Sequence, residues 1–219
     1  IVSNPPYSIK WDGDANPLLI NDPRFAPAGV LAPKSKADLA FTLHMLSWLA
    51  VNGTAAIVEF PGVLYRGGAE QKIRKYLIDN NYVDTVIQLP PDLFFGTTIA
   101  TCVIVLKKSK KDNAVLFIDA SSEFVREGNK NKLSEANRQK ILDAFVARAD
   151  DDNFAHLVLN GDLAANSYNI SVSSYVEQED TSEAVDIAAL NSEIARIVAR
   201  QQELREQIDA IVADLEDAL

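Results

Sequence analysis

Cysteine, histidine and methionine are scarce in this chain of 219 residues, which has one cysteine, two histidines and one methionine. A single thiol, Cys102, cannot form an internal disulfide, and no cluster of cysteine and histidine predicts a zinc or other metal site. No apolar run approaches the roughly 20 residues that span a bilayer, and the first residues lack the pattern of a signal peptide. These absences argue against a disulfide-rich secreted protein and a membrane protein, so we expect a reducing, cytoplasmic setting.

Negative charge is in excess, but in one part of the chain only. The net charge is −10, and residues 177–219 hold 12 acids and three arginines, whereas residues 1–176 hold 19 acids and 18 bases. The near-neutral first part can still meet nucleic acid through local basic patches, so the overall charge does not exclude that partner. We therefore expect a body at 1–176 and an acidic linker with an appended helix at 177–219.

Short apolar runs alternate with helical patterns along the body. We expect strands at 1–3, 54–60, 84–89, 101–106 and 114–118, and helices at 35–53, 69–79 and 134–149. Ser35 and Asp38 have the spacing of a capping box at the start of the first helix. The alternation predicts an α/β fold with helices on the faces of a sheet. Four or five strands are few for a complete doubly wound sheet, so we expect the C-terminal half of a Rossmann-like domain.

The first residue adds to that expectation. The chain opens on Ile1 inside an apolar phrase, and its only methionine is Met45. We interpret it as a fragment of a longer protein.

A heptad pattern runs through the C-terminal part. Apolar residues recur at alternating steps of three and four, with one glutamine among them: Ile187, Leu190, Ile194, Ile197, Gln201, Leu204, Ile208, Ile211, Leu215 and Ala218. Such a seam predicts one helix of ~33 residues, ~50 Å long, that pairs with another helix. A surface helix packed along its own body is the alternative. A glutamine at a seam position would help to fix the register of a paired helix.

A proline-rich tetrapeptide, Asn4-Pro5-Pro6-Tyr7, directly follows the first expected strand. The exocyclic amino group of adenine is a poor nucleophile because its lone pair is delocalised into the ring. Two acceptors aimed at its N–H bonds, the Asn4 side-chain oxygen and the Pro5 carbonyl, would favour a more tetrahedral nitrogen, and Pro6 holds Pro5 extended. Tyr7 offers an aromatic face for a flipped base. A plain proline-rich turn is the alternative interpretation of this motif.

The tetrapeptide resembles the catalytic motif of amino methyltransferases that use S-adenosylmethionine, including DNA adenine-N6 enzymes and enzymes that methylate a protein glutamine amide. Further phrases resemble the methyltransferase (modification) subunit of type I restriction-modification systems, in order along nearly the whole chain: 36–41, 62–70, 73–77, 86–90, 93–94, 115–120, 166–170 and 175–176. The ordered set is more specific than the tetrapeptide alone.

The resemblance implies a DNA adenine-N6 methyltransferase subunit with S-adenosylmethionine as cofactor. It also implies DNA, a specificity subunit and a restriction subunit as partners. Asn4 and Pro5 would border the cofactor, whose glycine-rich loop precedes the motif in the family and is absent from these residues. The heptad seam would bind the specificity subunit, or a second copy of the chain when isolated.

Two further segments are candidates for contact with DNA or the target base. Arg66, Gly67 and Gly68 precede a helix and can approach a phosphate, although a helix-initiating loop explains them equally well. Phe94 and Phe95 can wall a base pocket, although core packing is as good an explanation. Four lysines at 107, 108, 110 and 111 are interpreted as a solvated turn, with contact to the DNA backbone as the alternative.

Two other functions stay open at this stage. A protein-glutamine N5 methyltransferase shares the tetrapeptide but leaves the long seam unexplained. A non-catalytic assembly module, acting through the C-terminal helix, would describe the isolated fragment.

Overall fold

The computed structural model describes residues 1–178 and 186–216. It divides the chain into two units, Ile1–Glu179 and Asp180–Leu219, and each is described by itself. None of the helices in the described part is both long and apolar enough to cross a membrane.

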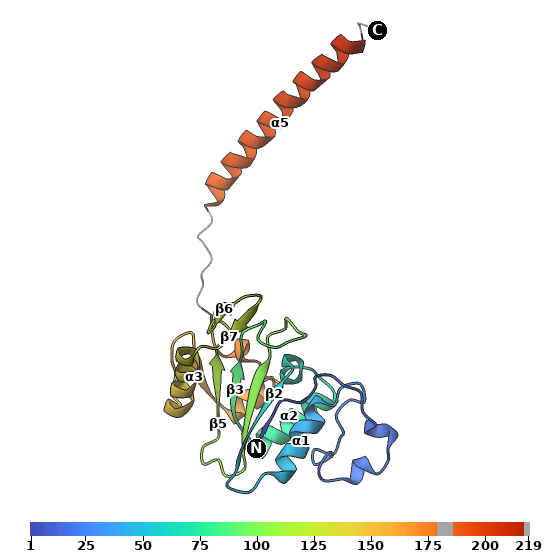
Figure 1. Cartoon of the computed structure of the whole chain (residues 1–219), viewed down its shortest axis with the longest axis vertical. Coiled ribbons are helices and arrows are strands. Elements are labelled where there is room, and N and C mark those ends of the chain that lie inside the picture. Colours follow the sequence, from blue (N-terminus) through green and yellow to red (C-terminus); the bar gives the residue numbers. More distant parts are fainter. Residues whose placement is uncertain (179–185, 217–219) are drawn as a thin grey trace. The chain divides into compact units, whose positions relative to one another are not determined.

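The first unit is built on a six-stranded sheet (Figure 1). Its strands are β1 (Val2–Ser3), β2 (Thr54–Glu59), β3 (Val83–Gln88), β4 (Cys102–Lys107), β5 (Ala114–Asp119) and β8 (Ala155–Leu159). They lie in the order β1-β2-β4-β3-β5-β8. Strands β1, β2, β3 and β5 run parallel, whereas β4 and β8 run antiparallel to their neighbours. The predicted α/β fold is confirmed.

The expected number of strands was too low. Strand β8 and a separate hairpin, β6 (Val125–Glu127) with β7 (Lys130–Lys132), were not predicted. The hairpin strands have three residues each, too few to show a periodic pattern. Strand β8 follows a run of aspartates that is typical of a loop, and two of its five side chains are exposed. The continuous apolar run that predicted the buried strands is therefore missing from β8 and from the β6–β7 hairpin.

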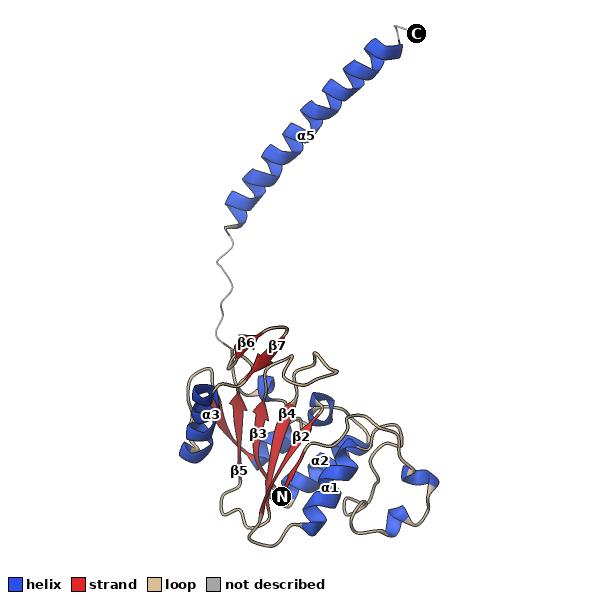
Figure 2. Cartoon of the chain, in the orientation of Figure 1, coloured by secondary structure: helices blue, strands red, loops and turns tan. Residues whose placement is uncertain are grey.

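Helices cover both faces of the sheet (Figure 2). They are α1 (Asp38–Trp48), α2 (Ala69–Asp79), α3 (Glu135–Ala147) and the short α4 (Asn160–Ala165), with 3₁₀ turns at Gly13–Ala15, Leu19–Asn21, Pro61–Leu64 and Val172–Ser174. Alternate strand residues point to opposite faces. Val86 and Phe117 join the core under α1, α2 and α4, whereas Ile87 and Ile118 join a second core under α3.

The parallel strands bring four connections to one edge of the sheet. The carboxyl ends of β1, β2, β3 and β5 are followed by the tetrapeptide, by residues 60–68, by residues 89–101 and by the β6–β7 hairpin. Figure 1 shows β3 and β5 pointing toward this edge. Ligands of open α/β sheets bind at the carboxyl ends of the strands, so this carboxyl edge is the place to look for a site.

The capping box predicted for the first helix is wrong. Helix α1 begins at Asp38, its N-cap is Ala37, and no side chain caps it. Asp38 serves a distant loop instead, as described below. Helix α2 spans the predicted residues, and α3 begins and ends within two residues of its predicted limits.

The second unit contains α5 (Ile187–Glu216), a helix of 30 residues. Its apolar seam side chains, from Ile187 to Leu215, are between 43% and 70% exposed. Val198 and Val212 widen the seam and are also exposed. Ala218, the last predicted seam residue, lies outside the described residues. The described part of this unit has no second helix that could cover the seam.

Candidate functional site

The tetrapeptide leaves the sheet at the carboxyl end of β1. Asn4 is exposed and Pro5 is buried, and the Tyr7 hydroxyl donates a hydrogen bond to Asn4 Oδ1 (2.9 Å). An amide oxygen has two lone pairs, so Asn4 can accept one further hydrogen bond. Burial raises the pKa of the Tyr7 phenol, and Glu59 adds to the shift. Tyr7 is therefore a neutral donor at physiological pH.

Asp38 holds the turn that follows the motif. The backbone N–H of Ser8 donates to Asp38 Oδ1 (2.8 Å), and Ser8 has φ 51°, a left-handed conformation that is costly for a residue other than glycine. Asp38 is 1% exposed, and its Oδ2 has no partner among the described residues. Sequence reasoning assigned this carboxylate to its own helix, because a contact between residues 8 and 38 has no local signal.

Glu59 is a second buried acid beside the motif, and sequence reasoning missed it. Glu59 is the last residue of β2, the strand that pairs with β1 directly before the motif, and it lies close enough to Tyr7 to raise the pKa of that phenol. Thr42 donates a hydrogen bond to Glu59 Oε1 (2.6 Å), whereas Oε2 has no partner in the described part of the chain. Burial raises the pKa of Glu59 to about 8. The sequence did contain a signal for this residue, because Glu59 is a single acid at the end of an apolar strand.

Arg66 turns back toward its own loop. Its guanidinium carbon lies 5.0 Å from the centre of the Phe60 ring, and its Nη1 lies 3.6 Å from Glu70 Oε1. A Cβ added at Gly62 would stand 2.3 Å from the guanidinium, so a side chain at that position would displace Arg66. Gly68 caps α2 with φ 68°. These contacts favour the helix-initiating interpretation of Arg66, Gly67 and Gly68, and a role in phosphate contact stays a prediction.

Phe94 and Phe95 have opposite environments. Phe94 is half-buried and packs against the core under α3, whereas Phe95 is 96% exposed. The hairpin β6–β7 lies against this loop, and Lys130 Nζ donates to the Phe94 and Thr97 carbonyls (3.0 and 3.1 Å). The two phenylalanines, which sequence reasoning treated as a pair, therefore require separate roles.

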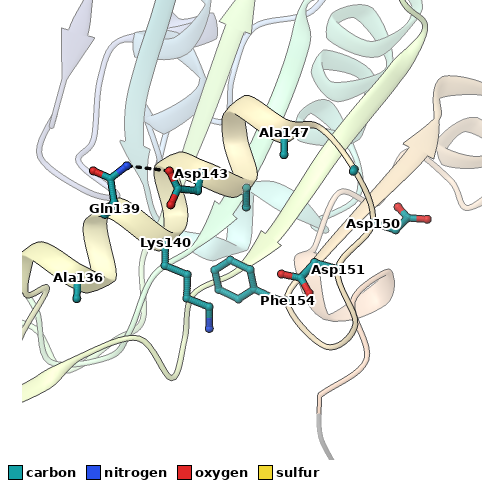
Figure 3. Close-up of a pocket in the computed structure, with 10 residues that line it drawn as sticks. Ala136, Gln139, Lys140, Asp143, Ala147, Asp150, Asp151 and Phe154 are labelled. Atoms are coloured by element: carbon teal, nitrogen blue, oxygen red, sulfur yellow. Dashed lines mark hydrogen bonds between the residues drawn. The ribbon is translucent and has the colours of Figure 1, made fainter.

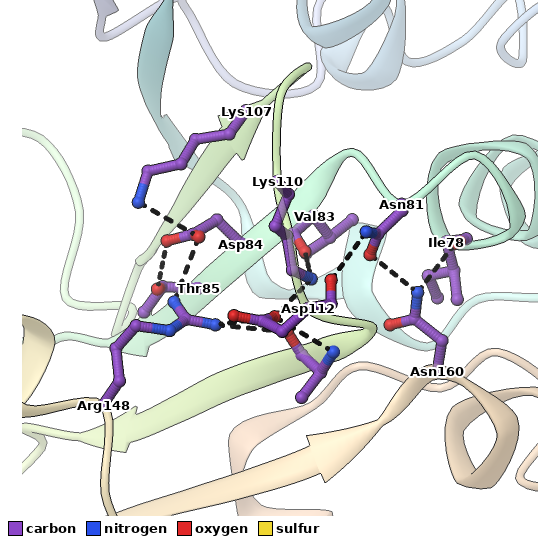
Figure 4. A network of polar contacts seen from close by, with 11 residues as sticks. Ile78, Asn81, Val83, Asp84, Thr85, Lys107, Lys110, Asp112, Arg148 and Asn160 are labelled. Carbon is purple, nitrogen blue, oxygen red and sulfur yellow. Dashed lines mark hydrogen bonds and ion pairs between the residues drawn. The ribbon is translucent and has the colours of Figure 1, made fainter.

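The lysines at 107–111 are not a purely solvated turn. Lys107 lies 3.1 Å from Asp84, which is 2% exposed and also receives a hydrogen bond from Arg148 (3.0 Å; Figure 4). Lys110 donates to the Val83 carbonyl (2.7 Å), and burial lowers its pKa to about 8. Lys108 donates to a carbonyl of the α1–β2 connection. Three of the four lysines therefore bind groups at the amino edge of the sheet, opposite the motif.

A hollow of about 520 Å³ lies beside α3 (Figure 3). Short side chains of α3, Lys140, Phe154 and a run of aspartates line it, and the Lys140 ammonium lies 4.2 Å from the centre of the Phe154 ring. No residue predicted for chemistry lines the hollow. Within residues 1–178 and 186–216, no group of three His, Cys, Asp or Glu side chains is placed to hold a metal ion.

Comparison with known sequences places residues 1–184 in a match to the family described as N-6 DNA Methylase. The chain is 51% identical over 216 residues to the type I restriction enzyme MpnII methylase subunit of Mycoplasma pneumoniae. It is 30% identical over 220 residues to the MjaVII methylase subunit of Methanocaldococcus jannaschii. The alignments cover 98% and 94% of this chain, but only 40% and 37% of the relatives.

A solved structure shows the same likeness. The type I restriction-modification methyltransferase subunit of Streptococcus thermophilus superposes with a TM-score of 0.78 at 48% identity. The superposition covers 80% of this chain and 37% of that one. The resemblance inferred from the sequence phrases is confirmed.

Proposed function

The chain belongs to the N-6 DNA methylase family, and from that premise we propose that it carries the catalytic motif for methylation of adenine N6 in DNA. The observation that supports this most is the Asn4–Tyr7 motif at the carboxyl edge, with Asn4 exposed and its turn held by Asp38. The chain spans about two fifths of the length of these relatives. The activity is therefore proposed for a protein of that length that contains these residues.

The proposed chemistry consists of positioning and electrostatics. Asn4 Oδ1 and the Pro5 carbonyl accept hydrogen bonds from the two N–H groups of the adenine amino group, and Tyr7 stacks on the flipped base. The hydrogen bond from Tyr7 fixes the Asn4 amide and leaves its second lone pair free. None of the four motif residues is a general base.

S-Adenosylmethionine is the proposed methyl donor, and it supplies an electrophilic methyl carbon. Asn4 and Pro5 fit one border of its site, because the acceptor atoms of the motif lie where the strand ends. The family's glycine-rich loop is not among residues 1–219, so we expect these residues alone to be inactive. Calorimetry at micromolar protein should detect no binding of S-adenosylmethionine to them. Stoichiometric binding would contradict this assignment of the cofactor site.

The proposed partner of the α5 seam is a helix of the specificity subunit, in a cytoplasmic complex that also includes the restriction subunit. Eight apolar seam side chains are exposed along α5, which forms an unusually long apolar stripe. Ile197→Asp with Ile208→Asp would bury charge in a paired seam and should abolish co-purification with the specificity subunit. Ala199→Asp with Gln202→Asp, outside the seam of the same helix, is the matched control.

Retained co-purification of the seam variant at unchanged affinity would contradict this proposal. Self-association of the isolated chain that the seam variant also loses would identify a second copy as the occupant in isolation.

Product analysis tests the proposed reaction. The full-length protein, with its specificity subunit, is incubated with labelled S-adenosylmethionine and either unmethylated DNA or a release-factor-like peptide that contains a target glutamine. We expect label in N6-methyladenine of the DNA and none in the peptide. Label in the peptide alone would support the glutamine methyltransferase instead.

A further inference from the structure

The loop between β3 and β4 carries an aromatic side chain that the fold leaves free. Phe95 is 96% exposed at the tip of this loop, on the carboxyl edge that also carries the Asn4–Tyr7 motif. A single exposed apolar side chain is common on protein surfaces. Phe95 differs because the loop that presents it is fastened on both sides of the tip.

The hairpin β6–β7 provides this fastening. The Lys130 ammonium bonds to the carbonyls of Phe94 and Thr97, which flank the tip. Asn131, itself 6% exposed, donates through Nδ2 to the Pro91 carbonyl (2.8 Å) and through its backbone N–H to the Asp92 carbonyl (3.1 Å). Four hydrogen bonds from two adjacent residues therefore hold the loop.

The loop is also anchored from below. The Phe94 ring packs in the core under α3, and Gly96 has φ 77°, which lets the chain reverse directly after Phe95. These contacts restrain the tip of the loop while the Phe95 ring is exposed to solvent. Little conformational entropy therefore remains to be lost when the ring enters a partner.

We infer that Phe95 is a wedge that enters the DNA duplex and fills the space left by the extruded adenine, and that Lys130 is its positioning residue. This inference rests on the proposed function. An enzyme that acts on a base must take it out of the stack. Apolar side chains such as Phe and Leu are known to insert between base steps and unstack them. The hairpin also presents Arg126, which is 52% exposed, beside the loop for phosphate contact.

The test compares two duplexes that contain the site methylated by the wild-type complex. In one the target adenine is paired with thymine, and in the other it lies opposite an abasic site, which makes extrusion cheap. The variants are made in the full-length protein within its complex. Phe95→Ala should lower the methylation rate on the paired duplex about 10–100-fold and on the abasic duplex by no more than about twofold. Phe95→Leu should retain most of the activity on both.

Lys130→Met should show the same dependence on pairing, because the loop loses its clamp. Lys132→Met is the matched control on the same hairpin, since the ammonium of Lys132 pairs only with the exposed Glu127 among the described residues, and it should leave the ratio of the two rates unchanged. Fluorescence of 2-aminopurine at the target position should rise with wild type and fail to rise with Phe95→Ala.

Several results would overturn the inference. Equal loss on both duplexes would place Phe95 in the base pocket or in folding, and loss of complex assembly would make it a protein contact. Unchanged rates would leave it without a role in the reaction. Failure of the wild-type complex to methylate either duplex would instead contradict the proposed function, and the inference with it.

Discussion

The two edges of the sheet handle buried acids in opposite ways. At the amino edge, the carboxylate of Asp84 is 2% exposed and lies 3.1 Å from the Lys107 ammonium and 3.0 Å from the Arg148 guanidinium. At the carboxyl edge, Glu59 is fully buried with one hydrogen bond and no cation within ion-pair distance in the described structure. Two acids with similar burial therefore have different surroundings.

The amino edge is therefore the edge whose buried charge is arranged for stability. Burying a charge is costly unless it is paired. The charge of Asp84 is paired with two cations, whereas Glu59 avoids the cost by keeping its proton and staying neutral. Protein interiors normally satisfy their polar groups, and exceptions gather where function sets the geometry. Glu59 and Asp38, which form no ion pair among the described residues, lie beside the motif, and the paired acid lies at the far edge.

Removal of the paired acid should have the largest effect on stability. Asp84→Ala leaves Lys107 and Arg148 facing an apolar gap, and should lower the free energy of unfolding of the chain by about 3–5 kcal/mol in urea denaturation. Asp112→Ala is the control, because Asp112 also approaches Arg148 (3.3 Å) but is 52% exposed. It should cost less than about 1 kcal/mol. Equal losses would remove the contrast between buried and exposed pairs.

Because Glu59 is buried, the free energy of unfolding should depend on pH. Burial moves its pKa from 4.5 to about 8, so between these values the folded state keeps a proton that the unfolded state has lost. Stability should therefore fall as pH rises from about 4.5 to 8, and the limiting slope is about 1.4 kcal/mol per pH unit. Glu59→Gln lacks this titration, so its stability relative to wild type should rise by a few kcal/mol between pH 5 and 8.

Glu127→Gln, a change of an exposed carboxylate, serves as the control for that series. Its stability relative to wild type should stay nearly constant over the same pH range. A Glu59→Gln curve parallel to that of wild type would show that Glu59 is ionised in the fold.

The smallest of these effects concerns the turn after the motif. Asp38→Ala removes the acceptor for the Ser8 N–H and should cost about 1–3 kcal/mol in urea denaturation. Asp38→Asn keeps an acceptor oxygen at Oδ1 and should cost less. If both variants were as stable as wild type, the left-handed turn at Ser8 would not depend on this contact.

Much of the body was predictable because its signals are local. The buried β2, β3, β4 and β5 are continuous apolar runs, and α2 has a helical period between Gly68 and Asp79. The tetrapeptide after β1 and the ordered phrases indicated the family. Each of these features depends on a few neighbouring residues.

The rest depends on contacts between distant residues. Asp38 meets Ser8 across 30 positions, and Lys130 meets the Phe94 carbonyl across 36. No periodicity or composition reports such pairs, so the sequence pattern alone placed Asp38 with its own helix and did not separate Phe94 from Phe95. The functional edge is assembled by loops, and its supporting contacts became visible only in the fold.

The methylation rate of the Asn4→Ala protein decides whether the carboxyl edge of the sheet is the catalytic edge. Asn4 is exposed and hydrogen-bonds only to Tyr7 among the described residues, so its loss should leave the unfolding midpoint almost unchanged. The rate of N6-adenine methylation by the full-length complex should fall ~10²–10³-fold, as for loss of one preorganised contact to the reacting group. A near-normal rate with Asn4→Ala would contradict the account.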